Sequence, residues 1–297
     1  MFRPVKFRHY LALMQHHGHA SADVLAGTGL REAMLSDPDC LIDVSQAKTI
    51  LARMIALTGD QGLGLEAGRQ TELLDLGLVG HAIMSAPSAR EAVHYWMNYS
   101  NTLVGTLIQM RLEEHGPNDW SLLISETVPL GFVYNFCTEE TLVMAYRLAG
   151  VLTGTPAHMT GLELSYPAPA HQALYAQHFD GPIRFNAPQT RIRFNRPSLD
   201  LPIRGNDQAF NALCARQCEL MLRRIGEQSP CATQVRNVLM RLRGQTPTID
   251  TVARALALSP RHLRRQLHSE GHSFQHVLSD FRQAMVKEYL SATDMTP

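Results

Sequence analysis

The chain has 297 residues, of which 45% are hydrophobic, and its 27 basic and 27 acidic residues give a formal net charge of zero. This length fits one large domain or two ordinary domains with a sizeable core. No apolar run approaches the roughly 18 residues that span a bilayer, and the N-terminus lacks the charged-then-apolar pattern of a signal peptide. The five cysteines form no regular framework, which favours a reducing compartment. We therefore expect a cytoplasmic protein with no membrane partner.

The first 225 residues predict a mixed α and β domain in which helices outnumber strands. Apolar residues at helical spacing predict helices at residues 1–60, 89–103, 132–152, 171–179 and 206–225. Alternating or continuous apolar runs predict strands at residues 73–86, 106–113, 120–126, 159–166, 183–185 and 190–194. The turn residues Gly116-Pro117-Asn118-Asp119 predict a hairpin between the second and third of these strands.

This domain carries no recognisable catalytic or metal-binding motif. We find no phosphate-binding glycine loop, nucleophile elbow or metalloprotease motif in it. The adjacent pairs Glu113-Glu114 and Glu139-Glu140 do not predict a catalytic pair, because neighbouring residues on a helix or strand do not face one another. The cluster His16-His17-Gly18-His19 lacks a cysteine or acid at matching spacing, so a helix end is favoured over a metal site. We expect no enzyme, no cofactor and no metal. The apolar interior could hold a small ligand, but no effector-binding residue is marked.

The polar segment at residues 226–230, which contains a glycine and a proline, predicts a domain boundary. The expected domains are residues 1–226 and 231–297, joined by a linker at residues 227–230. The second domain has nine basic and five acidic residues, whereas the remainder has 18 and 22. A small basic module on a larger, mildly acidic one is typical of a nucleic-acid reader joined to a sensor or assembly domain.

Two short helices joined by a tight turn are predicted between Thr248 and Gly271. Thr248 can cap the first helix, and one apolar stripe of that helix contains Ile249, Val252, Ala253 and Leu256. Ser259-Pro260 restarts a helix, with serine as N-cap and proline at the first position, and Gly271 is suited to end it. Because only Ala257-Leu258 separates the two, the chain must turn sharply into a helix-turn-helix.

The second of these helices turns Leu263 and Leu267 inward and leaves a basic face outside. That face consists of Arg261, His262, Arg264, Arg265, Gln266 and His268. A solvated basic surface is the alternative interpretation. We favour DNA reading, because recognition helices reach base edges with their N-terminal residues and arginine suits bidentate contact with guanine. The sequence thus predicts double-stranded DNA as a partner.

A helix that includes Val235 and Leu242 precedes this unit, and a long helix at residues 273–292 follows it, with an apolar stripe that includes Met285 and Tyr289. This order resembles the DNA-binding half of AraC/XylS-type transcription regulators. Four upstream segments resemble the arabinose-binding-like sensor domain of one branch of that family: residues 62–65, 76–80, 162–167 and 179–185.

The resemblance implies a bacterial cytoplasmic regulator, associated with the nucleoid when bound to DNA. It implies an α+β sensor and dimerisation domain followed by an all-α helix-turn-helix domain. Further implied partners are a second copy of the chain, a hydrophobic small-molecule effector such as a fatty acid, and RNA polymerase. Base contacts are implied for Arg261, Arg264 and Arg265. A place near the DNA backbone is implied for His262, Gln266 and Ser273.

One departure from the family pattern concerns a second helix-turn-helix, which is expected where the chain stops at Thr296-Pro297. With one reader we expect weak DNA binding by a monomer, and specific binding only by a dimer or with the missing unit. An alternative hypothesis is a sensor or interaction protein that does not bind DNA and acts through its dimer interface, with helix 206–225 as the test surface. An enzyme, based on the mixed architecture alone, is the least favoured alternative.

Overall fold

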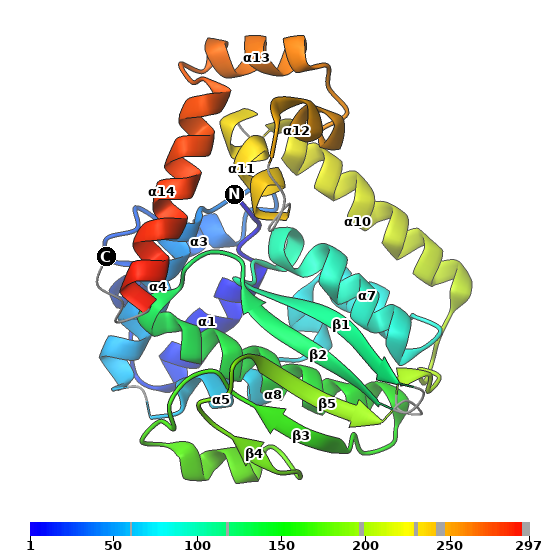
Figure 1. Ribbon diagram of the computed structural model, residues 1–297. Helices are drawn as coiled ribbons and strands as arrows, with labels where there is room; N and C mark the ends of the chain where they lie inside the picture. The colour runs from blue at the N-terminus through cyan, green and yellow to red at the C-terminus, as the bar shows by residue number, and fades with distance from the viewer. Residues whose placement is uncertain (60, 117–118, 196–198, 229–230, 242–246, 293–297) are drawn as a thin grey trace. The chain divides into compact units, whose positions relative to one another are not determined.

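The computed structural model describes residues 1–59, 61–116, 119–195, 199–228, 231–241 and 247–292 (Figure 1). Contacts divide the chain into two units, Met1–Leu222 and Arg223–Pro297. None of the described helices is long and apolar enough to cross a membrane.

The first unit begins with helices, as predicted for residues 1–60. The helices in its first half are α1 (Val5–His16), α2 (Ser21–Leu25), α3 (Glu32–Leu35), α4 (Val44–Thr58), α5 (Leu63–Gln70), α6 (Leu78–Met84) and α7 (Ala89–Tyr99). Local sequence explains their limits. In α4, for example, the Asp43 side chain accepts from Gln46 N at 2.8 Å, and the Gln46 side chain accepts from Asp43 N at 3.0 Å. This reciprocal cap starts the helix, and left-handed Gly59 (φ 74°) ends it.

A five-stranded sheet and the long helix α8 (Tyr134–Thr153) form most of the rest of the first unit, and α10 (Gln208–Gln228) begins in the first unit and ends in the second. The strands are β1 (Ile108–Gly116), β2 (Asp119–Glu126), β3 (Met159–Glu163), β4 (Ile183–Arg184) and β5 (Thr190–Asn195). Four short helical turns complete this unit: η1 (Leu73–Leu76) between α5 and α6, η2 (Ser100–Val104) before β1, η3 (Gly131–Val133) before α8, and η4 (Gln172–Gln177) between β3 and β4. This arrangement confirms the predicted helix-rich α+β class.

The strand order is β1-β2-β5-β3-β4, and only β3 and β4 pair in parallel. The β1–β2 hairpin is as predicted, although Pro117 and Asn118 of its turn lie outside the described residues. The register sets Leu122 opposite Ile192, and Ile192 opposite Leu162. All three are buried, so one face of the sheet carries a continuous apolar row.

The prediction of a buried strand at residues 73–86 is wrong, because this segment forms η1 and α6. Gly77 (φ 60°) separates the two turns. Gly80 lies so close to the preceding turn that an added Cβ would stand 1.8 Å from Leu73 O. A continuous apolar run fits a buried helix as well as a buried strand, and the close approach at Gly80 is decided by tertiary packing.

Helices α5 and α8 touch through their backbones, because two glycines of α5 face α8. A Cβ at Gly64 would lie 2.7 Å from Phe136 O, and one at Gly68 would lie 2.5 Å from Glu140 O. The four-residue spacing puts both glycines on one side of α5. Any larger residue at either position would push the helices apart.

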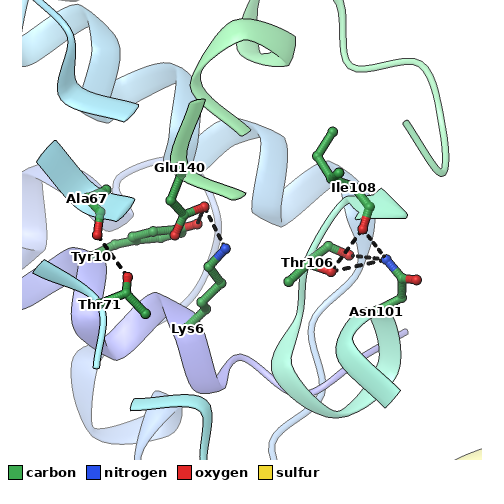
Figure 2. Close-up of polar contacts among 8 residues, drawn as sticks. All are labelled: Lys6, Tyr10, Ala67, Thr71, Asn101, Thr106, Ile108 and Glu140. Carbon is green, nitrogen blue, oxygen red and sulfur yellow. Dashed lines mark hydrogen bonds and ion pairs between the residues drawn. The ribbon is translucent and has the colours of Figure 1, made fainter. Parts of the chain in front are cut away.

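The buried helix predicted at residues 132–152 is confirmed as α8, and it carries two fully buried carboxylates. Glu140 accepts from Lys6 Nζ at 2.5 Å and from Tyr10 OH at 2.8 Å (Figure 2). Glu139 contacts a different pair, His171 Nε2 at 2.7 Å and Tyr175 OH at 2.6 Å. The adjacent glutamates therefore have separate partners. Burial and the Glu140 charge hold the pKa of Tyr10 well above its usual value.

Helix α10 is the amphipathic helix predicted at residues 206–225, and it extends to Gln228. Residues 227 and 228, which the sequence places in the linker, thus belong to its last turn, and Ser229 and Pro230 lie outside the described residues. Buried Asn211 anchors the helix: its Nδ2 donates to Ala82 O at 2.8 Å, and its Oδ1 accepts from Tyr95 OH at 2.6 Å.

The apolar residues of α10 divide into two faces. Cys214 and Cys218 are buried, whereas Phe210, Leu213 and Leu220 are 43%, 53% and 48% exposed. Helical periodicity alone groups these residues together; the packing of the first unit covers only some of them.

The second unit is all helical: α11 (Cys231–Arg241), α12 (Ile249–Ala255), α13 (Pro260–Ser269) and α14 (Phe274–Ala292). Its core is apolar and consists of Cys231, Ala232, Val235, Val238, Leu239, Val252, Ala253, Leu263, Leu267, Phe274, Val277 and Leu278. The predicted stripe of the last helix supplies the final three. Leu242 and the side chains of Met285 and Tyr289 lie outside the described residues.

Candidate nucleic-acid interface

The first helix of the predicted pair forms where its cap requires. The Thr248 side chain accepts from Thr251 N at 3.2 Å, which satisfies one of the unpaired N–H groups of the first turn of α12. Val252 and Ala253 then point into the core and are fully buried. The small side chain of Ala253 leaves room for a neighbouring helix.

The turn between α12 and α13 is as tight as the sequence predicts. Ala257 has a φ of 54°, a left-handed conformation that costs a residue with a Cβ about 1–2 kcal/mol. Leu258 N donates to Ala253 O at 2.8 Å, and Ala257 N donates to Arg254 O at 3.1 Å. The chain thus reverses at a single strained residue and is held by hydrogen bonds back to α12.

Helix α13 starts at the predicted cap and is anchored from below. Ser259 Oγ accepts from His262 N at 3.2 Å, and Pro260 occupies the first turn. Leu263 and Leu267 have no exposed surface. Gly271 (φ 77°) follows the C-terminal end of the helix, as predicted.

The outer face of α13 is basic. Arg261, Arg264 and Arg265 are all exposed, and within the described residues none of them pairs with an acid; the contact of Arg265 is with His262 Nδ1 at 3.3 Å. Figure 1 shows α13 at the edge of its unit, between α12 and the start of α14. Three cations on an anchored helix are therefore open to an anionic partner.

The residues expected near the DNA backbone differ in how far they are exposed to solvent. His262 and Gln266 are half-buried, and Ser273 is exposed. Ser273 Oγ accepts from His276 N at 3.1 Å, so this hydroxyl caps α14. The other N–H groups of that first turn have the partial positive charge that favours a phosphate oxygen.

Sequence reasoning missed a residue that positions α13. Glu270, directly after α13, accepts from Cys231 N at 2.5 Å and from Ala232 N at 2.9 Å. Its carboxylate therefore caps the start of α11, where the helix dipole favours a negative charge. No local pattern could indicate this cap, because the partners lie 39 residues apart. Burial raises the pKa of the Cys231 thiol to about 11, and the negative charge of Glu270 contributes to the same rise.

Comparison with known proteins places this arrangement in a family. The family model described as "Arabinose-binding domain of AraC transcription regulator, N-term" matches residues 18–203. The ornithine utilization regulator of Pseudomonas aeruginosa is 28% identical over 286 residues, which cover 96% of this chain and 84% of that protein. An uncharacterized HTH-type transcriptional regulator of Mycobacterium tuberculosis is 29% identical over 283 residues, 94% of this chain and 82% of that protein.

A solved structure has the same fold. The crystal structure of the transcriptional regulator CdpR from Pseudomonas aeruginosa aligns with 99% of this chain and 86% of its own, with a TM-score of 0.51 and 21% identity. The family match extends over more than half of the chain and lies within the first unit, whereas the helix-turn-helix described above lies in the second. The chain therefore belongs to the AraC family of transcription regulators, in the branch with an arabinose-binding-type N-terminal domain, and is a DNA-binding transcription regulator.

Proposed function

We propose that α13 is the recognition helix and that Arg261, Arg264 and Arg265 read base edges in the major groove. The observation that carries this proposal is the contrast between the two sides of α13: two leucines are fully buried, and three arginines are exposed and have no acidic partner in the part of the chain that the structure describes. Arginine forks match the O6 and N7 acceptors of guanine. His262, Gln266 and the α14 N-terminus at Ser273 contact the DNA backbone and set the register.

In this proposal residues 1–226 form the sensor and dimerisation domain, residues 227–230 the linker and residues 231–297 the DNA-binding domain. The protein acts in the bacterial cytoplasm, on the nucleoid, by binding rather than by catalysis. Its other partners are a hydrophobic small-molecule effector and, at the promoter, RNA polymerase.

The dimer forms through the exposed apolar face of α10. Phe210, Leu213 and Leu220 lie three and seven residues apart, the spacing of a helix–helix seam. Three large apolar side chains on one helix face are typical of an interaction site. Replacing Leu213 with Glu is expected to convert the dimer to a monomer in sedimentation velocity. An unchanged sedimentation coefficient would rule out this face.

The base-reading proposal is tested by anisotropy, with a labelled fragment from upstream of the gene and a random fragment of equal length. Arg264→Ala or Arg265→Ala is expected to lower discrimination between the two by about 5- to 150-fold, the value of one good bidentate contact. Arg111→Ala is the matched control, because this 69% exposed arginine lies in the first unit and its loss changes net charge equally.

If either arginine variant loses the same affinity for both fragments, that arginine does not read bases and contacts only a phosphate. Absence of DNA binding by the dimer at low salt would favour the second hypothesis, an interaction protein that acts through α10. A salt titration separates these outcomes, because each phosphate contact adds to the slope of log affinity against log salt.

A further inference from the structure

The first unit contains an apolar cavity of about 120 Å³ between helices α7 and α8 and the sheet. Its inner wall includes Trp96 of α7, Leu148 of α8 and three sheet residues, Trp120, Leu122 and Ile192. All five are buried. The inner end of the cavity therefore lies within the core of this unit, beside the apolar row of the sheet, and its other end is lined by exposed Thr155 and Pro156.

The described residues that line this cavity include no charged side chain, and most of their polar groups have partners within the protein. Tyr146 OH donates to Asp180 and to Ala157 O. Thr153 Oγ1 donates to Ala149 O at 2.8 Å. A sugar has a hydroxyl on nearly every carbon, and an unpaired hydroxyl in an apolar site is costly. The lining is thus unsuited to arabinose, despite the description of the family's domain.

One buried polar group of the lining has no partner among the described residues. The indole Nε1 of Trp96 is inaccessible and donates no hydrogen bond. Buried N–H groups are nearly always paired, with protein, water or ligand. A single acceptor on a bound molecule would satisfy this group.

We propose that this cavity is the effector site and that the effector is a compact apolar molecule with one hydrogen-bond acceptor, a single ring or a short alkyl chain. The size follows from the volume, since an apolar cavity of about 150 Å³ binds benzene in another protein. The acceptor oxygen pairs with Trp96 Nε1, and the apolar body packs against Trp120 and Leu122. This inference rests on the proposed sensor role of the first domain.

The protein contains its own probe for this site. Its two tryptophans are Trp96 and Trp120, and both line the cavity. Tryptophan emission therefore reports on the cavity without a label. Cyclohexanone represents the ring, 2-hexanone represents the chain, and L-arabinose represents the sugar; both ketones are uncharged and have one acceptor oxygen. We expect saturable changes in emission with cyclohexanone or 2-hexanone, and none with L-arabinose at the same concentrations.

Variants test the site in the 297-residue chain. Ala149→Phe fills the cavity from α8 and is expected to weaken binding of the responsive probe by about tenfold or more; Ala145→Leu is a second, milder filling. Val151→Phe is the matched control on the same helix, since Val151 is 56% exposed and outside the lining. Trp96→Phe keeps an aromatic ring but lacks the N–H, and is expected to weaken binding by about fivefold, read from Trp120.

Four results would overturn the proposal: no response to either apolar probe, a response to L-arabinose alone, probe binding that both filling variants leave unchanged, or equal affinity in Trp96→Phe. Sequence-selective DNA binding, measured on the same samples, separates this proposal from the proposed function. If the protein still discriminates between specific and random DNA but no probe changes the emission, only the effector-site proposal is wrong. If a probe binds but the protein does not discriminate between the two DNA fragments, only the proposal that α13 reads bases is wrong.

Discussion

The two units place their charges in opposite ways. The first unit buries ionised groups, among them Lys6 with Glu140, and packs α5 against α8 through glycines. The second unit has an apolar core, and its described arginines on α13 are exposed. Buried charges must be paired in one geometry, so they favour a single arrangement of the first unit. Charges left outside remain available to a partner, so the same residue types serve structure in one unit and binding in the other.

The largest expected effect breaks the buried pair of the first unit. Lys6→Ala leaves the Glu140 carboxylate buried without its cation, which is expected to cost about 3–5 kcal/mol of unfolding free energy. Urea unfolding followed by tryptophan emission measures this cost, because both tryptophans lie in the first unit. Arg111→Ala, an exposed charge, is expected to change stability by less than about 0.5 kcal/mol. If the two variants lose equal amounts of unfolding free energy, the buried Lys6–Glu140 pair stabilises the fold no more than an exposed charge does.

The next effect tests the apolar core of the second unit. Leu267→Ala removes a fully buried side chain and is expected to cost about 2–5 kcal/mol. Because the second unit has no tryptophan, the emission transition should remain in place while an earlier transition appears in far-UV circular dichroism and DNA affinity falls. A shift of the emission transition as well would show that the two units unfold together.

A smaller effect concerns the cap that joins the end of α13 to the start of α11. Glu270→Gln retains the shape but removes the charge that accepts from two backbone N–H groups, and is expected to cost about 0.5–2 kcal/mol. Circular dichroism melts measure this loss. Asp280→Asn removes a carboxylate charge from α14, where Asp280 is 42% exposed, and serves as the comparison. The cap is unimportant if both substitutions lower the melting temperature equally.

The smallest effect tests the strained turn. Ala257→Gly relieves the left-handed conformation but increases the freedom of the unfolded chain, so a net gain of about 0.5–1 kcal/mol is expected. The same melts measure this gain, with Ala255→Gly at the last residue of α12 as the control, since glycine there relieves no left-handed strain and only increases the freedom of the unfolded chain. A loss of stability in Ala257→Gly would show that the turn is not strained.

Local chemistry in the sequence determined much of the second unit. Thr248, Ser259 and Pro260 mark helix starts, and the two leucines of α13 mark its inner face, because capping and helical periodicity act within a few residues. The same local signals predicted the β1–β2 hairpin and the buried helix α8. The basic face of α13 could likewise be read from the order of residues alone.

Tertiary structure decided what depends on contacts between distant residues. The segment at residues 73–86 became η1 and α6 because Gly80 permits a backbone contact that periodicity does not encode. Glu270 became the cap of α11, and Glu139 and Glu140 found partners more than 30 residues away. The cavity beside Trp96 exists only once helices and sheet are packed. A single sequence specifies the side-chain chemistry of each position. The contacts between distant residues, in contrast, are selected by the free energy of the whole fold.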